Sequence, residues 1–89
     1  MKPITEFSDD ARADNEGVRR FAEAMKRKLK KKRQEGYSGW NAPNECSIDR
    51  LVELMRRHLR KGDPVDIANF CMMIWNRQQA DHGGEEGGR

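Results

Sequence analysis

Apolar residues recur at intervals of three and four along three segments of the chain, and this spacing predicts three α-helices. The first of these helices begins firmly at Val18 and is expected to end at Gly36, because glycine readily adopts the left-handed conformation that terminates helices. Several basic residues just before Gly36 also suit the negative C-terminal end of a helix. The apolar stripe of this segment consists of Val18, Phe21, Ala22, Met25 and Leu29.

The second and third predicted helices follow each other almost without a linker. Ser47 is a suitable N-cap for the second helix, and Gly62 is a suitable stop. Asp63 and Pro64 then provide an N-cap and a first helical residue for the third helix. So short a connection predicts an antiparallel helical hairpin. The apolar stripe of the second helix consists of Ile48, Leu51, Val52, Met55 and Leu59.

The remaining segments lack a clear helical pattern. Residues 1–17 are predicted to be a partly helical arm, residues 36–46 a loop, and residues 78–89 a glycine-rich, disordered tail. The expected fold is therefore all-α: a small three-helix bundle over residues 18–77, with a tight C-terminal helical hairpin, a flexible N-terminal arm and a disordered C-terminal tail. Because 35% of the chain is hydrophobic and 37% is charged, its core should be thin, and oligomerisation is one usual remedy.

The predicted third helix, residues 64–77, is apolar around most of its circumference, which is typical of a buried helix. Two neighbouring helices cover only part of such a surface, so a protein partner or a homodimer is expected, with a self-sufficient monomer as the alternative. Asp66 and Asn69 are polar residues one turn apart on this helix, and Asn69 is expected to bond across the bundle or a dimer seam, with a role in fixing the register or in binding a ligand. For Met72 and Met73, filling of the core is the alternative to a role in an interface. The candidate protein-interface residues are Phe70, Met72, Met73 and Trp75.

Charge is distributed unevenly along the chain. Residues 1–17 carry a formal charge of −3 and residues 18–33 carry +8, with seven basic residues between Lys26 and Arg33. Such a helix can follow nucleic-acid phosphates, and its binding would weaken as salt rises. The alternative for the basic residues is a charged face that only contacts solvent, and the alternative for Trp40 is that it fills the open end of the bundle. The candidate nucleic-acid-binding residues are Lys26, Arg27, Lys30, Lys31, Arg33, Tyr37 and Trp40.

Two stretches, KLKKKRQEGYSGW (28–40) and KGDPVDIANFCMMIWNR (61–77), carry a resemblance to a known group of proteins. The chain resembles small helical proteins encoded by phages and prophages, which share a basic helix, a G-x-x-G-W loop and a K-G-D-P-x-D-[IV]-A-N-F-x-M-M helix. The resemblance covers about a third of the chain. It implies an all-α fold and makes a host-directed binding role plausible, but it implies no settled activity.

Some such phage proteins resemble the all-α MazG-like nucleotide pyrophosphohydrolases, which implies Mg²⁺ held by an E-x-x-E pair and an E-x-x-D pair. The acids available here are Asp49 and Glu53 on the second helix and Asp63 and Asp66 on the third. Asp49 and Glu53 are four apart rather than three, and Asp63 is better explained as an N-cap. The set of four carboxylates that the metal needs is therefore incomplete, which favours a non-enzymatic protein.

No metal site, cofactor or membrane segment is expected. His58 and His82 have no Cys or His at ligand spacing, and Cys46 and Cys71 lie far apart. No apolar run reaches the ~18 residues of a transmembrane helix, and no apolar signal segment follows Met1, so a cytoplasmic protein is predicted.

The sequence thus favours a small interaction protein of phage or prophage origin that binds a host or self protein through its apolar helical hairpin. Nonspecific nucleic-acid binding through the basic helix is the alternative, and MazG-like, Mg²⁺-dependent pyrophosphohydrolysis is the second alternative.

Overall fold

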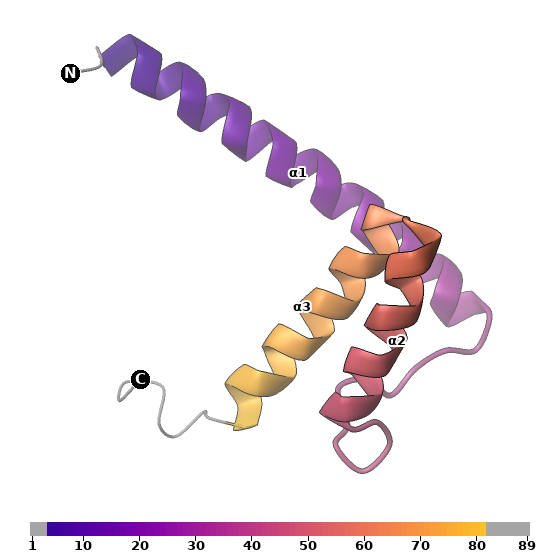
Figure 1. Cartoon of the computed structure of the whole chain (residues 1–89). Helices are drawn as coiled ribbons and strands as arrows, with labels where there is room; N and C mark the ends of the chain where they lie inside the picture. Colours follow the sequence, from indigo (N-terminus) through magenta and orange to yellow (C-terminus); the bar gives the residue numbers. More distant parts are fainter. Residues whose placement is uncertain (1–3, 82–89) are drawn as a thin grey trace.

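The fold is all-α, with three helices and no strands in the part of the chain that the structure describes (Figure 1). The structure, a computed structural model, describes the backbone of residues 4–81 and the side chains of residues 8–81. The helices are α1 (Ile4–Gln34), α2 (Ile48–Lys61) and α3 (Pro64–Asp81). The all-α fold and the helical hairpin of α2 and α3 confirm the prediction from the sequence.

The first helix is longer than the apolar pattern indicated. α1 runs without interruption from Ile4 to Gln34, so the predicted arm is regular helix over most of its length. Gly17 does not break the helix, because one glycine costs a helix interior only about 1 kcal/mol. The predicted stop is confirmed: Gly36 has φ +98°, its N–H donates to the carbonyl of Arg33, and the N–H of Tyr37 donates to the carbonyl of Lys32. These two bonds form a Schellman motif.

The connection between α2 and α3 has the predicted caps. The Ser47 hydroxyl accepts a hydrogen bond from the N–H of Arg50 at 3.0 Å and starts α2. Gly62 ends α2 at φ +75°, where its N–H donates to carbonyls of the last turn. Asp63 Oδ1 then accepts from the N–H of Val65 at 2.9 Å, so α3 begins at once. The abrupt turn returns the chain beside α2 and fixes the hairpin.

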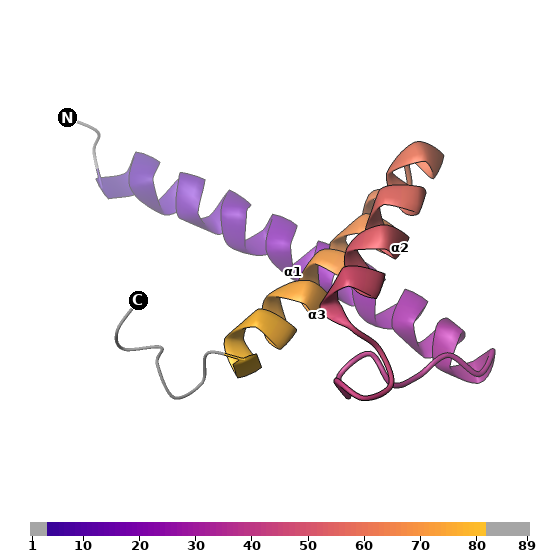
Figure 2. The same ribbon diagram turned by 60° about the horizontal axis from the view of Figure 1, so that its bottom comes forward.

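The long helix crosses the hairpin and does not run along it. α1 packs against α3 and not against α2, and its N-terminal half extends away from the hairpin (Figures 1 and 2). From residue 12 to residue 20 every side chain of α1 is exposed. Among the described side chains, Leu51 of α2 is the only fully buried hydrophobic one. The core is as thin as the composition implied, and half of α1 receives no support from it.

The third helix also exceeds its predicted end. It continues to Asp81, so the first four residues of the predicted disordered tail, residues 78–81, are helical. The polar side chains of this last turn are exposed, and a helix needs no apolar pattern where it simply continues into solvent. The rest of the predicted tail, residues 82–89, lies outside the described residues.

Candidate functional site

One polar cluster fastens α1 to the start of α3. The Lys28 ammonium lies 3.1 Å from Asp63 Oδ2 and 3.2 Å from Asp66 Oδ1. Hydrogen bonds to Asp63 and then to Asp66 raise the pKa of Lys28. The hydrogen bond from Lys28, followed by the one from the backbone N–H of Val65, lowers the pKa of Asp63. The cluster is therefore an ion triad that orients α1 across the hairpin.

A buried asparagine makes a second contact between α1 and α3. Asn69 is 4% exposed, and its Nδ2 donates a long hydrogen bond of 3.4 Å to the carbonyl of Met25. The bond across the bundle that the sequence predicted for Asn69 is therefore present. Its Oδ1 has no hydrogen-bond partner among the described residues. Because an unpaired buried polar atom costs about 1–3 kcal/mol, Asn69 makes the position of α1 specific and contributes little net stability.

A buried arginine holds the loop between α1 and α2, and no pattern in the sequence indicates this role. Arg77 is 5% exposed although it lies near the end of α3. Its Nη1 donates to the carbonyl of Trp40 at 2.9 Å and to the carbonyl of Cys46 at 2.5 Å. Both acceptors are backbone atoms, which a sequence pattern does not reveal. Arg77 thus bridges the middle of the loop, at Trp40, and its end before α2, at Cys46, and this pair of contacts is called the clasp below.

The predicted protein-interface residues are not equivalent in the structure. Trp75 is 59% exposed, whereas Phe70, Met72 and Met73 are half-buried. The ring of Phe70 lies 4.9 Å from the ring of His58, so Phe70 belongs to the packing between α2 and α3. Of the predicted set, Trp75 is therefore the side chain that a partner reaches most easily.

Two further apolar side chains are exposed on α1. Val18 is 69% exposed and Phe21 is 37% exposed, and they precede Met25 at helical spacing on the side of α1 that faces α3. The sequence placed both in the stripe that packs against the core. Both side chains stay exposed because α3 contacts α1 nearer its C-terminal end, from about Met25 onward. The exposed apolar side chains of Val18 and Phe21 on α1 and of Trp75 on α3 are together named the apolar surface below, and what they share is their exposure.

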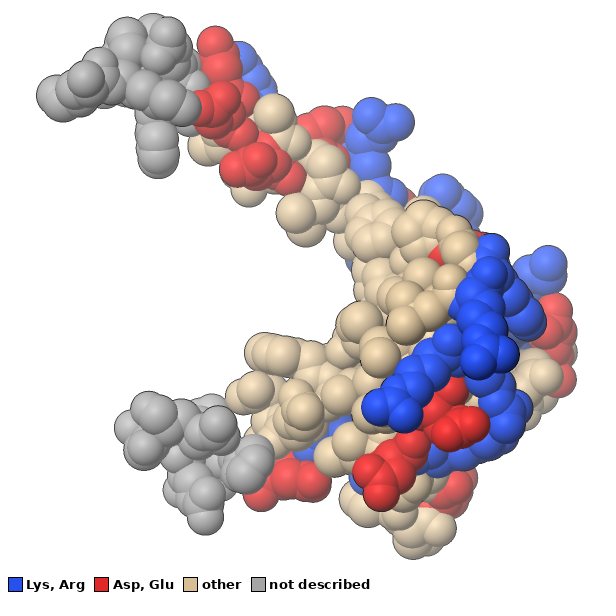
Figure 3. All heavy atoms as spheres, viewed as in Figure 1, with Lys and Arg blue, Asp and Glu red and all other residues tan. Residues whose placement is uncertain are grey.

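The arrangement of charge separates two sides of the molecule. Figure 3 shows that the side enclosed between the N-terminal half of α1 and α3 is covered largely by uncharged residues. Lys and Arg gather instead on the outer, convex side, over α1 and α2 (Figure 3). One side therefore carries little charge, and the other suits an anion.

Of the predicted nucleic-acid-binding residues, all but Trp40 are exposed. The five basic residues of the set are exposed on α1, and Tyr37 is 64% exposed with Lys32 Nζ lying 5.3 Å from the centre of its ring. Trp40 is half-buried, and Arg77 holds its carbonyl, so it is poorly placed to stack on a base. The five basic residues are Lys26, Arg27, Lys30, Lys31 and Arg33.

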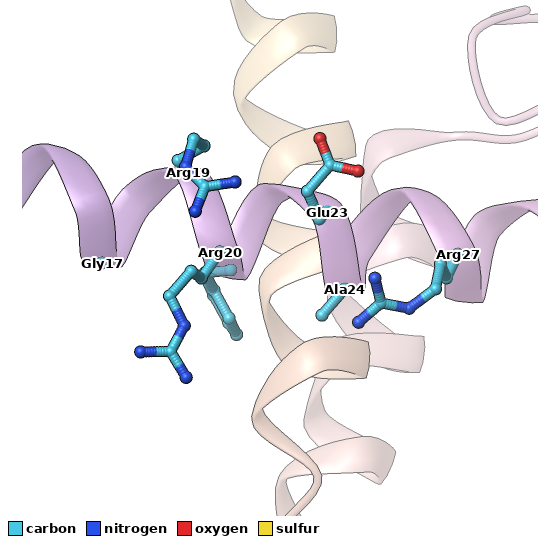
Figure 4. A pocket seen from close by; sticks show the side chains of 7 residues that line it. Gly17, Arg19, Arg20, Glu23, Ala24 and Arg27 are labelled. Carbon is cyan, nitrogen blue, oxygen red and sulfur yellow. The ribbon is translucent and has the colours of Figure 1, made fainter.

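A shallow depression of about 630 Å³ lies along α1 (Figure 4). Small residues, Gly17 and Ala24, leave space between the longer side chains of Arg20 and Arg27. Arg20 does not belong to the predicted set, because that set was chosen from the dense basic run that begins at Lys26. Helical spacing, with Arg20 seven residues before Arg27, was the signal that would have found it.

Three of the four acids considered for a metal have other partners. Asp63 and Asp66 hold the ammonium of Lys28, which puts a positive charge where a metal would have to bind, and Glu53 pairs with Arg57 at 3.6 Å. Within residues 8–81, no group of three or more His, Cys, Asp or Glu side chains is placed to hold a metal ion. The described carboxylates therefore give no support to a Mg²⁺-dependent hydrolase.

Comparisons of the chain with protein-family models, with curated proteins and with solved structures find no match. None of the helices in the described range 4–81 combines the length and the apolar character needed to cross a bilayer.

Proposed function

We propose that this chain is a non-enzymatic interaction protein that binds a protein partner through the apolar surface of Val18, Phe21 and Trp75. The observation that carries the proposal is the 59% exposure of Trp75 in a domain whose described core holds a single fully buried hydrophobic side chain. A small domain does not normally leave a tryptophan in water while its own core is thin, since burying an aromatic ring is strongly stabilising.

The neighbouring geometry supports the same function. Val18 and Phe21 continue the side of α1 that packs on α3, so the apolar stripe extends beyond the intramolecular contact. Aromatic side chains are enriched where protein interfaces are most strongly stabilised. The resemblance to small phage-encoded proteins favours a host protein or a second copy of the chain as the partner.

Site-specific photo-cross-linking tests the proposal. A photoreactive amino acid at Trp75 should cross-link a protein in extracts of the native cell, and the cross-link should survive nuclease treatment. Asn76 is the matched control, because it is exposed and adjacent but points to another side of α3. A second copy of the chain as partner would appear as a dimer of the purified protein in sedimentation.

The variant Trp75→Gln separates binding from folding. Because Trp75 is largely exposed, its replacement should change the free energy of unfolding by less than about 0.5 kcal/mol. The partner or the dimer should nevertheless be lost. A monomer that cross-links equally from positions 75 and 76, or not at all, would show that this surface has no protein partner.

A further inference from the structure

The exposed surface of the second half of α1 is strongly basic and largely unneutralised. On the basic half of α1, four cations have a described acidic partner within 4.0 Å: Arg19, Lys26, Lys28 and Lys32. Five others are exposed and have no ion pair among the described residues: Arg20, Arg27, Lys30, Lys31 and Arg33.

Three of the unpaired cations form one row. Arg20, Arg27 and Lys31 are seven and four residues apart, so they lie on one side of the helix, about 10 Å and 6 Å apart along its axis. Gly17 and Ala24 lie on the same side and form the floor of the depression between the long side chains (Figure 4). These three residues are named the basic row. All three of its side chains are exposed, and the start of α3 borders the row at Arg27 and Lys31.

The basic row is not isolated on the surface. The start of α3 adjoins it, because Asp63 and Val65 line a second depression together with Arg27 and Lys31. The preceding end of α2 carries the exposed cations Arg60 and Lys61. Figure 3 shows the resulting concentration of Lys and Arg on the convex side. Asp63, the charged residue of the hairpin that borders the row, is paired with Lys28 and so leaves the positive charge of the row largely intact.

We propose that the basic row binds the phosphate backbone of double-stranded DNA without reading its sequence. A duplex carries one negative charge per ~1.7 Å of axis, and the row presents fixed cations along a straight rod. An α-helix of about 10–12 Å diameter also matches the major groove of B-DNA, which is ~12 Å wide. The major groove of duplex RNA is too narrow for such contacts.

Two features favour a duplex over a single strand. Proteins that bind single strands stack the bases on aromatic side chains, and the aromatic side chain that lines the depression with Arg20 and Arg27, that of Phe21, is 37% exposed. Trp40, which the sequence suggested for stacking, is half-buried with its carbonyl held by Arg77. The acidic N-terminal half of α1, with Asp9, Asp14 and Glu16 exposed, repels phosphates and confines the contact to the second half of the helix.

Salt dependence provides the quantitative test. If the three cations of the basic row each neutralise one phosphate, the slope of log K against log salt is about −2.7, and affinity falls about 40-fold between 50 and 200 mM salt. Fluorescence anisotropy with a labelled 20-base-pair DNA measures this for the full-length chain. Arg27→Gln with Lys31→Gln should reduce the slope by about 1.8.

A double variant of equal charge change serves as the control. Arg12 and Arg50 are exposed and lie outside the basic row, so Arg12→Gln with Arg50→Gln should leave the slope nearly unchanged. Thermal unfolding monitored by circular dichroism checks that both variants are folded. Equal losses in the two variants, or no binding to the duplex at 50 mM salt, would overturn the proposal. Tighter binding to single-stranded DNA or to duplex RNA of the same length would overturn it as well.

Discussion

Replacement of Arg77 should destabilise the whole domain and not only the end of α3. Its guanidinium donates to two carbonyls that lie six residues apart in the loop, those of Trp40 and Cys46. Methionine retains most of the apolar stem, so Arg77→Met mainly removes these two bonds. The variant isolates the clasp from the packing around it.

The magnitude follows from the charge and burial of the donor. A hydrogen bond to a charged group contributes about 1.5–3 kcal/mol, and the loss of two such bonds is partly offset because the buried charge disappears with them. A decrease of about 2–4 kcal/mol in the free energy of unfolding is expected. This is a large share of the total stability of so small a domain, which at ~0.05–0.15 kcal/mol per residue is only about 4–12 kcal/mol.

Urea unfolding followed by circular dichroism measures this loss. With a slope of about 1 kcal/mol per molar urea, the midpoint should fall by about 2–4 M. Arg56→Met is the matched control, because Arg56 is exposed and has no ion pair among the described residues, and it should shift stability by less than about 0.5 kcal/mol. Arg77→Lys should lie between the two, since lysine keeps the charge but not the planar fork.

A second readout distinguishes the clasp from general destabilisation. If Arg77 holds the loop, limited proteolysis of Arg77→Met should begin within residues 37–46 under conditions in which the control remains intact. Equal urea midpoints for Arg77→Met and Arg56→Met, together with equal protection of the loop, would refute this account of Arg77.

Three other changes test the contacts that fix the helices. Lys28→Met should flatten the pH dependence of thermal stability at both acid and alkaline pH. The lowered pKa of Asp63 stabilises the fold above the ordinary carboxylate range, and this stabilisation is lost as the pH falls through the folded pKa of Asp63. The raised pKa of Lys28 stabilises the fold below about pH 10.4, and this stabilisation is lost as the pH rises through the folded pKa of Lys28. An unchanged pH profile in the variant would contradict the ion triad. Gly62→Ala should cost about 1–2 kcal/mol, because Gly62 has φ +75°, and equal urea midpoints would show that the turn relaxes. Leu51→Ala should cost about 2–5 kcal/mol, since Leu51 is 1% exposed, and a loss below 1 kcal/mol would mean that the site collapses around the smaller side chain.

The parts of the fold that local chemistry determines were predictable from the sequence. Ser47 caps α2, Gly62 turns the chain into α3, and Gly36 ends α1, and each of these roles depends on a residue's own conformational preference. The angle at which α1 crosses the hairpin was not predictable, because contacts between distant residues set it, such as the one between Lys28 and Asp66.

The candidate sites show the same division. The excess apolar character of the third helix was visible in the sequence, but only the packing shows that Trp75 is exposed while Phe70 lies against His58. The stripe through Val18 and Phe21 was assigned to the core because periodicity does not indicate where a neighbouring helix stops covering it. For Arg77, the partners are main-chain carbonyls, so no pairing of side chains in the sequence pointed to its role.

The half of α1 that extends beyond the hairpin can fray independently of the rest. No tertiary packing holds the exposed turns from residue 12 to residue 20, and their local support includes the ion pairs of Asp9 with Arg12 and of Glu16 with Arg19. Pairs of this kind contribute only about 0.2–0.5 kcal/mol each and weaken in salt. Amide hydrogens of this half should therefore exchange through local opening, orders of magnitude faster than those of α3, and a ligand that seats on Val18 and Phe21 would slow that exchange selectively.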